Sequence, residues 1–263
     1  MKINMIYNED CLETMKKMPD NFIDLVITSP PYDDLRAYKG FSFDFCSTAK
    51  QLERGLKQGG IIVWIVNDKT VRGSESGRSF EQVLFFKKLG LNLHDTMIWD
   101  KGSCRFPETN RYYPCFEYMF VLSKGQPKTH HLIEDRPNKF ANSKVARAHQ
   151  IRTVTGEVIA NSAFKIAPNR RIKPVGVRFN IWKIAVSASS GDKSALKHPA
   201  SFPEQLVYDH IISWSNEGDL VYDPFMGSGT TGKMCLLSKR QYLGSEISKE
   251  YCEIAKLRGC VYK

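Results

Sequence analysis

Ser29, Pro30 and Tyr32 could together hold a flat molecule that carries an amine. They lie in the sequence Thr28-Ser29-Pro30-Pro31-Tyr32, which directly follows an apolar run at 22–27. A serine hydroxyl and a proline carbonyl can each accept a hydrogen bond from an amine, and a tyrosine ring can stack on a flat group. The alternative is a rigid Pro-Pro turn after an edge strand, and the local sequence alone does not decide between these interpretations.

A second segment indicates a binding site for a ligand that contains a ribose. An apolar strand at 220–222 leads into Asp223-Pro224-Phe225-Met226-Gly227-Ser228-Gly229-Thr230-Thr231, and a helix is predicted at 232–239. Glycines let the backbone approach a ligand closely, and the start of a helix offers free N–H groups. The next predicted strand, 241–246, ends in Glu246, where an acid can bind a ribose diol. The alternative is an ordinary strand-to-helix turn, but the acid at this distance favours a ligand site.

The elements that must position these residues form an alternating series of strands and helices. Such alternation predicts a mostly parallel sheet with helices on both faces. Both motifs then lie at the carboxyl ends of strands, where open α/β sheets bind their ligands. The predicted strands are 5–7, 22–28, 61–66, 91–100, 115–122, 220–222 and 241–246, and the predicted helices are 11–18, 43–56, 80–89, 202–215, 232–239 and 249–258. Residues 67–79, rich in Gly and Ser, are predicted to form a mobile loop.

Together these segments resemble the beta class of the S-adenosylmethionine-dependent DNA methyltransferases that methylate exocyclic amines. Residues 28–32 resemble the catalytic motif of that family, and residues 223–230 resemble its cofactor loop. Lys197-His198-Pro199-Ala200-Ser201-Phe202-Pro203 resembles the segment that holds the methionine end of the cofactor, and Asn8-Glu9-Asp10-Cys11 resembles the turn whose acid faces the adenine. The catalytic motif precedes the cofactor loop, as in the permuted beta class, and the resemblance spans nearly the whole chain.

The resemblance implies a fold and a set of site residues. The implied fold is α/β and Rossmann-like, with a circularly permuted motif order and an antiparallel hairpin at one end of the sheet. The implied catalytic residues are Ser29, Pro30, Pro31 and Tyr32. The implied S-adenosylmethionine-binding residues are Asp10, Cys11, Lys197, Ser201, Asp223, Pro224, Phe225, Gly227, Gly229, Thr230 and Glu246. Among them, Glu246 is expected to bind the ribose, Asp223 to line the pocket beside the glycine loop, and Lys197 and Thr230 to contact the methionine carboxylate.

The implied reaction is methylation of a base that has been flipped out of duplex DNA. The amine of a base is a poor nucleophile because its lone pair is delocalised into the ring, and acceptors such as Ser29 Oγ and the Pro30 carbonyl would localise that pair. Serine at this motif position resembles the cytosine-N4 members of the family, whereas Asp or Asn is usual in the adenine-N6 members. Cytosine N4 is therefore the favoured target, and adenine N6 is the alternative.

Two other classes of protein are compatible with parts of the sequence. A non-catalytic DNA-binding protein could retain a methyltransferase scaffold, although its cofactor motifs would not need to be intact. A nicotinamide or flavin enzyme could use the same glycine loop. The loop lacks a third glycine at the dinucleotide spacing, however, which counts against this class.

Basic residues are concentrated between residues 124 and 183. This segment contains thirteen Lys and Arg residues and three acids, so it carries the whole net charge of +10. A basic charge confined to one segment is typical of a surface that contacts nucleic acid, although charge runs are usually only solvated faces. We therefore expect this segment to bind double-stranded DNA and to recognise the target. The candidate contacts are Arg147, Arg152, Arg170, Arg171 and Arg178.

The 263 residues are expected to form a methyltransferase domain with an insert. Residues 1–123 form its catalytic part, 124–183 the basic insert and 184–263 its cofactor-binding part. No apolar run approaches the ~20 residues that cross a membrane. Seven scattered cysteines without a Cys-x-x-Cys pair favour a reducing cytoplasm and argue against a disulfide framework or a metal site. We expect a cytoplasmic enzyme that associates with no membrane and binds no metal. The sequence does not decide whether it forms a homodimer.

Overall fold

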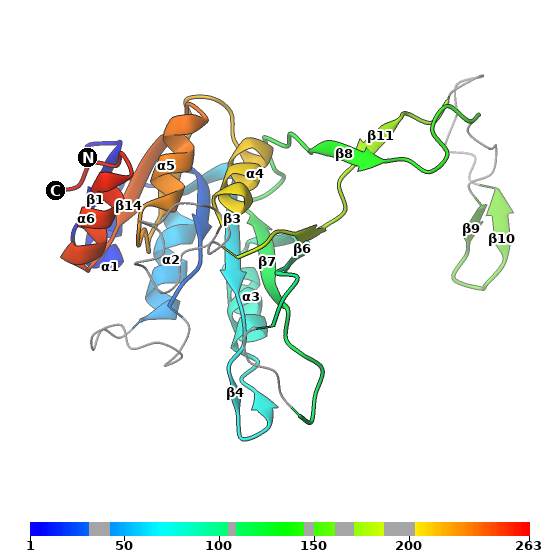
Figure 1. Cartoon of the computed structure of the whole chain (residues 1–263), viewed down its shortest axis with the longest axis horizontal. Helices are drawn as coiled ribbons and strands as arrows, with labels where there is room; N and C mark the ends of the chain where they lie inside the picture. The colour runs from blue at the N-terminus through cyan, green and yellow to red at the C-terminus, as the bar shows by residue number, and fades with distance from the viewer. Residues whose placement is uncertain (32–42, 105–108, 145–149, 161–170, 187–202) are drawn as a thin grey trace. The chain divides into compact units, whose positions relative to one another are not determined.

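The computed structural model describes residues 1–31, 43–104, 109–144, 150–160, 171–186 and 203–263 (Figure 1). The chain forms two compact units. The first comprises Met1–His131 and Asn180–Lys263, and the second comprises Leu132–Phe179. Residues 124–131 and 180–183, which we expected to be part of the basic insert, are therefore packed in the first unit.

An eight-stranded sheet forms the centre of the first unit. All its strands run in the same direction except β7, which is antiparallel to both of its neighbours. This confirms a mostly parallel sheet with an antiparallel pair, β6–β7, although β12 adds a further strand beyond that pair. The strand order is β1 (Met5–Tyr7), β14 (Gln241–Ser245), β13 (Leu220–Asp223), β2 (Ile23–Thr28), β3 (Leu56–Val66), β7 (Phe116–Ser123), β6 (Asn92–Asp100) and β12 (Ile181–Lys183).

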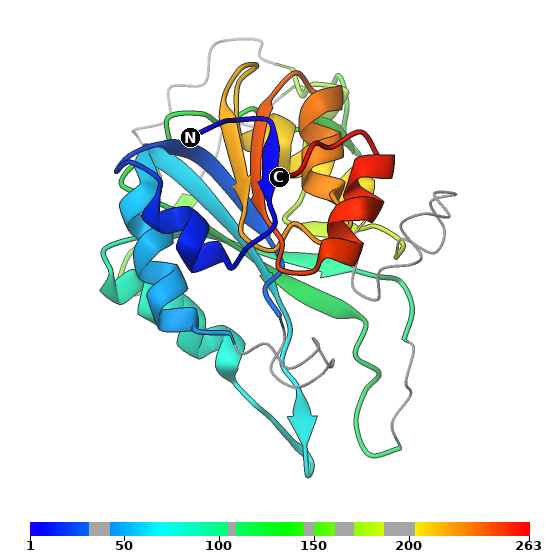
Figure 2. The same ribbon diagram turned by 90° about the vertical axis from the view of Figure 1, so that its left-hand side faces the viewer.

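Helices cover both faces of this sheet (Figure 2). On one face lie α1 (Cys11–Lys16), α2 (Phe45–Gly55) and α3 (Arg78–Lys88), and on the other lie α4 (Glu204–Trp214), α5 (Thr230–Leu237) and α6 (Lys249–Leu257). Strand β3 shows why two layers are needed, because its apolar side chains alternate between the two cores. Val63 packs in the core of α4–α6, whereas Trp64 is fully buried in the core of α1–α3.

The predicted mobile loop at 67–79 is wrong in part, because the structure forms a short hairpin there. Strands β4 (Thr70–Val71) and β5 (Ser74–Glu75) are antiparallel, and α3 begins soon after them at Arg78. Each strand is only two residues long, which is too short for an alternating pattern, and the neighbouring Gly and Ser residues are typical of a loop. The other predicted elements of the first unit agree with the structure to within a few residues, except that β3 begins at Leu56 rather than at residue 61.

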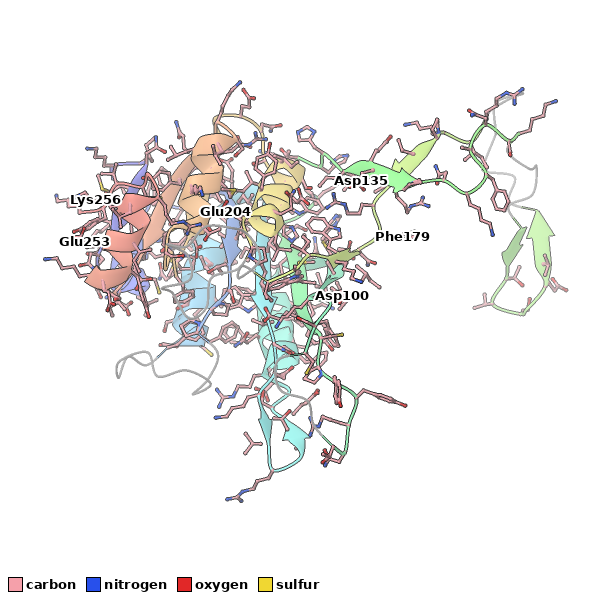
Figure 3. The ribbon with its side chains drawn as sticks, viewed as in Figure 1. Asp100, Asp135, Phe179, Glu204, Glu253 and Lys256 are labelled. Atoms are coloured by element: carbon pink, nitrogen blue, oxygen red, sulfur yellow. The ribbon has the colours of Figure 1, made fainter. Side chains whose placement is uncertain are left out.

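The second unit consists of two short antiparallel pairs. Strand β8 (Glu134–Pro137) pairs with β11 (Val175–Val177), and β9 (Gln150–Arg152) pairs with β10 (Val158–Ala160). Ion pairs involve two of the three acids in the basic segment. Glu134 lies 3.2 Å from Lys173, and Asp135 accepts a 3.0 Å hydrogen bond from Arg178 Nε (Figure 3).

Among the described residues, no helix has the length and apolar character needed to cross a membrane.

Candidate active site at the carboxyl edge of the sheet

Four neighbouring parallel strands, β1, β14, β13 and β2, end at the same edge of the sheet. Tyr7 of β1 is level with Ser245 of β14, and Asp223 of β13 is level with Gly244 of β14. Parallel pairing of β13 with β2 aligns the ends of those two strands as well. The structure therefore brings together the described motifs, which are Asp10 and Cys11 after β1, Ser29 to Pro31 after β2, Asp223 to Thr230 at the end of β13, and Glu246 after β14.

The carboxylate of Asp223 is buried at the centre of this edge, with 1% of the residue exposed. It accepts hydrogen bonds of 2.7 Å from Thr28 Oγ1 and from Thr231 Oγ1, and one of 3.0 Å from the Phe225 N–H. Burial raises the pKa of Asp223 to about 6, although these three donors act in the opposite direction. Asp223 thus joins the end of β2 to the first turn of α5.

The glycine loop between Asp223 and α5 requires glycine for a steric reason. Gly229, which directly precedes α5, has a φ of 79°, a conformation that residues with a side chain rarely adopt. A Cβ added to Gly229 would lie 2.7 Å from the Cβ of Ala255 in α6. The loop can therefore pack against α6 while the first N–H groups of α5 stay at the carboxyl edge.

Glu246, predicted to bind the ribose, also holds the glycine loop. Its carboxylate accepts hydrogen bonds of 2.8 Å from the N–H of Gly227 and from the N–H of Ser248. The residue is only 9% exposed, and this burial raises the pKa of its carboxyl group. A carboxylate offers roughly four acceptor sites. Two bonds to the backbone therefore leave acceptor capacity for a diol.

A buried arginine clamps the same loop, and sequence reasoning missed it. Arg258 follows α6, and its side chain is 2% exposed. Its Nη1 donates to the Ser228 carbonyl at 2.7 Å and to Thr230 Oγ1 at 2.9 Å, while Nη2 donates to Glu204 Oε1 at 2.7 Å. Lys233 donates to the same Glu204 oxygen at 2.6 Å. Glu204 is the first residue of α4 (Figure 3), so this cluster fixes the loop against two helices.

The turn after β1 has structural partners of its own. The exposed carboxylate of Asp10 accepts a 2.7 Å hydrogen bond from the Leu12 N–H and so caps α1. Cys11 is buried, and burial raises the pKa of its thiol to about 12. The thiol is therefore uncharged near neutral pH. The turn is linked to β14 because Asn8 Nδ2 donates to the Glu246 carbonyl at 2.8 Å.

The structure describes the motif that is predicted to be catalytic as far as Pro31. Ser29 and Pro31 are partly exposed after β2, and Pro30 is buried. Phe225 of the cofactor loop packs edge-on against Phe43, with 5.1 Å between the ring centroids. Tyr32, Lys197 and Ser201 lie outside the described residues. Within the described part of the chain, no group of three or more His, Cys, Asp or Glu side chains could hold a metal ion.

Comparisons with known proteins find relatives along most of the chain. A family model described as DNA methylase matches residues 23–257. The orphan methyltransferase M.BamHII of Bacillus amyloliquefaciens is 56% identical over 241 residues, which cover 91% of this chain and 89% of that protein.

Solved structures share the fold. The PvuII DNA methyltransferase, titled as cytosine-N4-specific, superposes with a TM-score of 0.70 at 20% identity, covering 98% of this chain and 90% of its own. The complex of M1.HpyAVI with SAM, the cofactor expected from the sequence, gives a TM-score of 0.59 at 22% identity, covering 97% and 98%. The chain therefore belongs to the family of DNA methylases that act on cytosine N4 or adenine N6, as its motifs predict.

Proposed function

We propose that this methyltransferase transfers a methyl group from S-adenosylmethionine to N4 of a cytosine that is flipped out of double-stranded DNA. The adjacency of β2 and β13 carries the proposal. Because the two strands end side by side, the Ser29 hydroxyl and the Pro30 carbonyl lie at the same edge as the glycine loop. An amine held by Ser29 and Pro30 is then close to a methyl donor held by the glycine loop.

The described loop residues suit an S-adenosylmethionine molecule, which supplies an activated methyl group when it is bound. Glu246 retains acceptors for the ribose hydroxyls after binding two N–H groups of the backbone. Thr230 Oγ1 accepts from Arg258, which can only donate, so the threonine keeps its own proton to donate to a carboxylate. Lys197, by its charge, is a second candidate for the methionine carboxylate.

Ser29 and the Pro30 carbonyl would act on the amine of the flipped base. By accepting hydrogen bonds from its two N–H groups they would localise the nitrogen lone pair and aim it at the methyl group. The methylated nitrogen would then release one of its protons to solvent, with S-adenosylhomocysteine as the other product. No covalent bond between enzyme and base is needed. A neutral serine in place of an acid or amide favours the cytosine target. Tyr32 would stack on the base.

The basic segment 124–183 would contact the DNA and carry target recognition. Of its five candidate arginines, Arg178 is bound to Asp135, whereas Arg171 is exposed and donates to the Asn142 carbonyl at 2.7 Å. Arg171 is therefore the better phosphate contact of these two. Arg147 and Arg170, and the side chain of Arg152, lie outside the described part.

The identity of the methylated base tests the proposal. Plasmid DNA is incubated with the purified protein and S-adenosylmethionine, then digested to nucleosides and analysed by mass spectrometry. N4-methyldeoxycytidine is the expected product. N6-methyldeoxyadenosine would replace the proposed target with the alternative one. If no methylated nucleoside forms although calorimetry shows that the cofactor binds, the chain is not an active DNA methyltransferase.

A further inference from the structure

Two segments project beyond the carboxyl edge of the sheet next to the catalytic strand. One is the hairpin β4–β5, which follows β3 directly, and β3 is the neighbour of β2, with Trp64 level with Thr28. The other is the segment 109–113, which precedes β7. Figures 1 and 2 show both segments extending in the same direction away from the sheet. We call residues 69–76 and 109–113 the edge arm.

Hydrogen bonds hold the edge arm in a defined position. Arg111 Nη1 donates to Thr70 Oγ1 at 2.8 Å and so connects its two segments. The carboxylate of Asp68 accepts from Ser76 Oγ at 2.8 Å and from the Ser79 N–H at 3.1 Å, which fastens the base of the hairpin to the start of α3. The arm is therefore an ordered projection.

The tip of the hairpin carries an arginine in an unfavourable backbone conformation. Arg72 has a φ of 51° and Gly73 a φ of 81°, the signs of a two-residue type I′ turn. Asn-Gly is the preferred pair in such turns, whereas a long side chain at the first position is strained. Arg72 is exposed, whereas Glu75, the acid of the arm, lies 3.9 Å from Arg111. A strained residue at an exposed tip points to a function of its side chain.

The second segment of the arm exposes large aromatic side chains. Tyr112 is 100% exposed and Tyr113 is 60% exposed. The described charged residues of the arm are Lys69, Arg72 and Arg111 against the single acid Glu75, so the arm is basic. Exposed aromatic rings among basic side chains suit nucleic acid, because rings stack on bases and cations bind phosphates.

We propose that the edge arm is a second DNA-contacting element, separate from the segment 124–183, that enters the duplex beside the flipped base. Arg72 contacts the DNA at the tip, and Tyr112 stacks on bases that lose their neighbour when the target leaves the helix. Arg72 is six residues beyond Val66, so a fully extended chain would place the tip at most about 20 Å from the edge of the sheet. Two paired strands fit the major groove, which is about 12 Å wide, better than the minor groove at about 6 Å.

This inference rests on the proposed DNA substrate, and binding measurements test it apart from catalysis. Arg72→Asn removes the charge but creates the favoured Asn-Gly pair, so the hairpin is retained. Lys88→Asn, at the last turn of α3, is the matched control for loss of an exposed charge. With a fluorescein-labelled 30-bp duplex of plasmid sequence, Arg72→Asn should weaken binding roughly ten-fold and lower the salt slope by about one, and Lys88→Asn should change neither.

Stacking by Tyr112 is tested with a duplex in which one guanine faces an abasic site, because this imitates an extruded cytosine. The parent protein should bind this duplex more tightly than the intact one. Tyr112→Ala should abolish that preference, and Tyr112→Phe should retain it. If Arg72→Asn binds the duplex like the parent and Tyr112→Ala keeps the parental preference for the abasic duplex, the edge arm is not a DNA contact. That result would not contradict the proposal that the protein methylates DNA. Absence of a methylated nucleoside in the parent reaction would instead reject the proposed function.

Discussion

Thr28 and Asp223 are 195 residues apart in the chain and are joined by a buried hydrogen bond of 2.7 Å. Thr28 ends β2, and Asp223 ends β13 and also accepts a hydrogen bond from Thr231 in the first turn of α5. One carboxylate therefore fixes the start of the proposed amine-binding motif relative to the glycine loop. Direct methyl transfer depends on such positioning, because donor and acceptor must be aligned before they react.

Thr28→Val tests the importance of this bond with little change in side-chain shape. It leaves the buried carboxylate with one donor fewer, so the free energy of unfolding should fall by ~1–3 kcal/mol. The rate of methyl transfer should fall as well, because the two motifs lose their connection. Thr48→Val is the matched control, since Thr48 is also buried but has only a weak contact at 3.9 Å with the Cys11 thiol. Urea denaturation and single-turnover kinetics measure the two effects, and equal behaviour of both variants would contradict the assignment.

The raised pKa of Asp223 predicts a pH dependence of stability. The folded protein binds the Asp223 proton up to about pH 6, whereas the unfolded chain releases it near the ordinary aspartate pKa of 3.8. The tighter proton binding by folded Asp223 therefore stabilises the protein fully below the unfolded pKa, and this stabilisation is lost as the pH rises through the folded pKa. The free energy of unfolding should fall by about 3 kcal/mol, at 1.36 kcal/mol per pKa unit. Asp223→Asn lacks the titrating group, so between about pH 4 and pH 7 the parent should lose stability relative to this variant. Urea denaturation of both proteins across this range gives the difference, and a constant difference would exclude the raised pKa.

Arg258 should affect cofactor binding through the loop that it clamps. Arg258→Met removes the bonds to Ser228 and Thr230, and we expect calorimetry to show about ten-fold weaker binding of S-adenosylmethionine, because each lost bond to a charged group is worth ~1.5–3 kcal/mol before relaxation of the loop. The change also leaves Glu204 with Lys233 as its remaining partner, which should destabilise the fold.

A second substitution separates these two effects of Arg258. Arg258→Met combined with Glu204→Gln removes the partly buried negative charge, so stability should recover in part while cofactor affinity stays low. Recovery of both properties together would mean that Arg258 acts only on folding.

Glu246→Ala should weaken the binding of S-adenosylmethionine by ~1–3 kcal/mol, because the ribose hydroxyls and the Gly227 N–H both lose an acceptor. Glu246→Gln keeps an acceptor oxygen and should lose less. The control is Glu81→Gln on the exposed surface of α3, which should bind the cofactor like the parent. Parental affinity in Glu246→Ala would rule out the ribose role.

The arrangement of the active edge could be predicted because its strands are apolar runs that end in distinctive residues. The run at 22–27 stops at two prolines, and 220–222 stops at a glycine loop, so the strands and their carboxyl ends were visible in the sequence. In a mostly parallel sheet these ends lie at the same edge, and the structure shows in addition that the two strands are neighbours.

Other features depend on directions and contacts that a single sequence does not specify. Asp223 is predicted to line the cofactor pocket, and no pattern in the sequence indicates that its carboxylate also accepts hydrogen bonds from Thr28 and Thr231. Arg258 is 54 residues from its partner Glu204, and nothing in the motif around it distinguishes it from an exposed helix-end arginine. The hairpin β4–β5 has strands too short to produce a hydrophobic pattern.

The rate of methyl transfer by Ser29→Ala tests the central claim most directly, because Ser29 is proposed to act on the base amine alone. The measurement is a single turnover with saturating DNA and S-adenosylmethionine, combined with calorimetry of cofactor binding. We expect the variant to bind the cofactor with parental affinity and to transfer the methyl group at least ten-fold more slowly, the effect of losing roughly 1.4 kcal/mol of stabilisation in the transition state. Tyr32→Ala should behave in the same way and also bind DNA more weakly. Transfer by Ser29→Ala at the parental rate would show that the motif after β2 is only a turn that ends a strand.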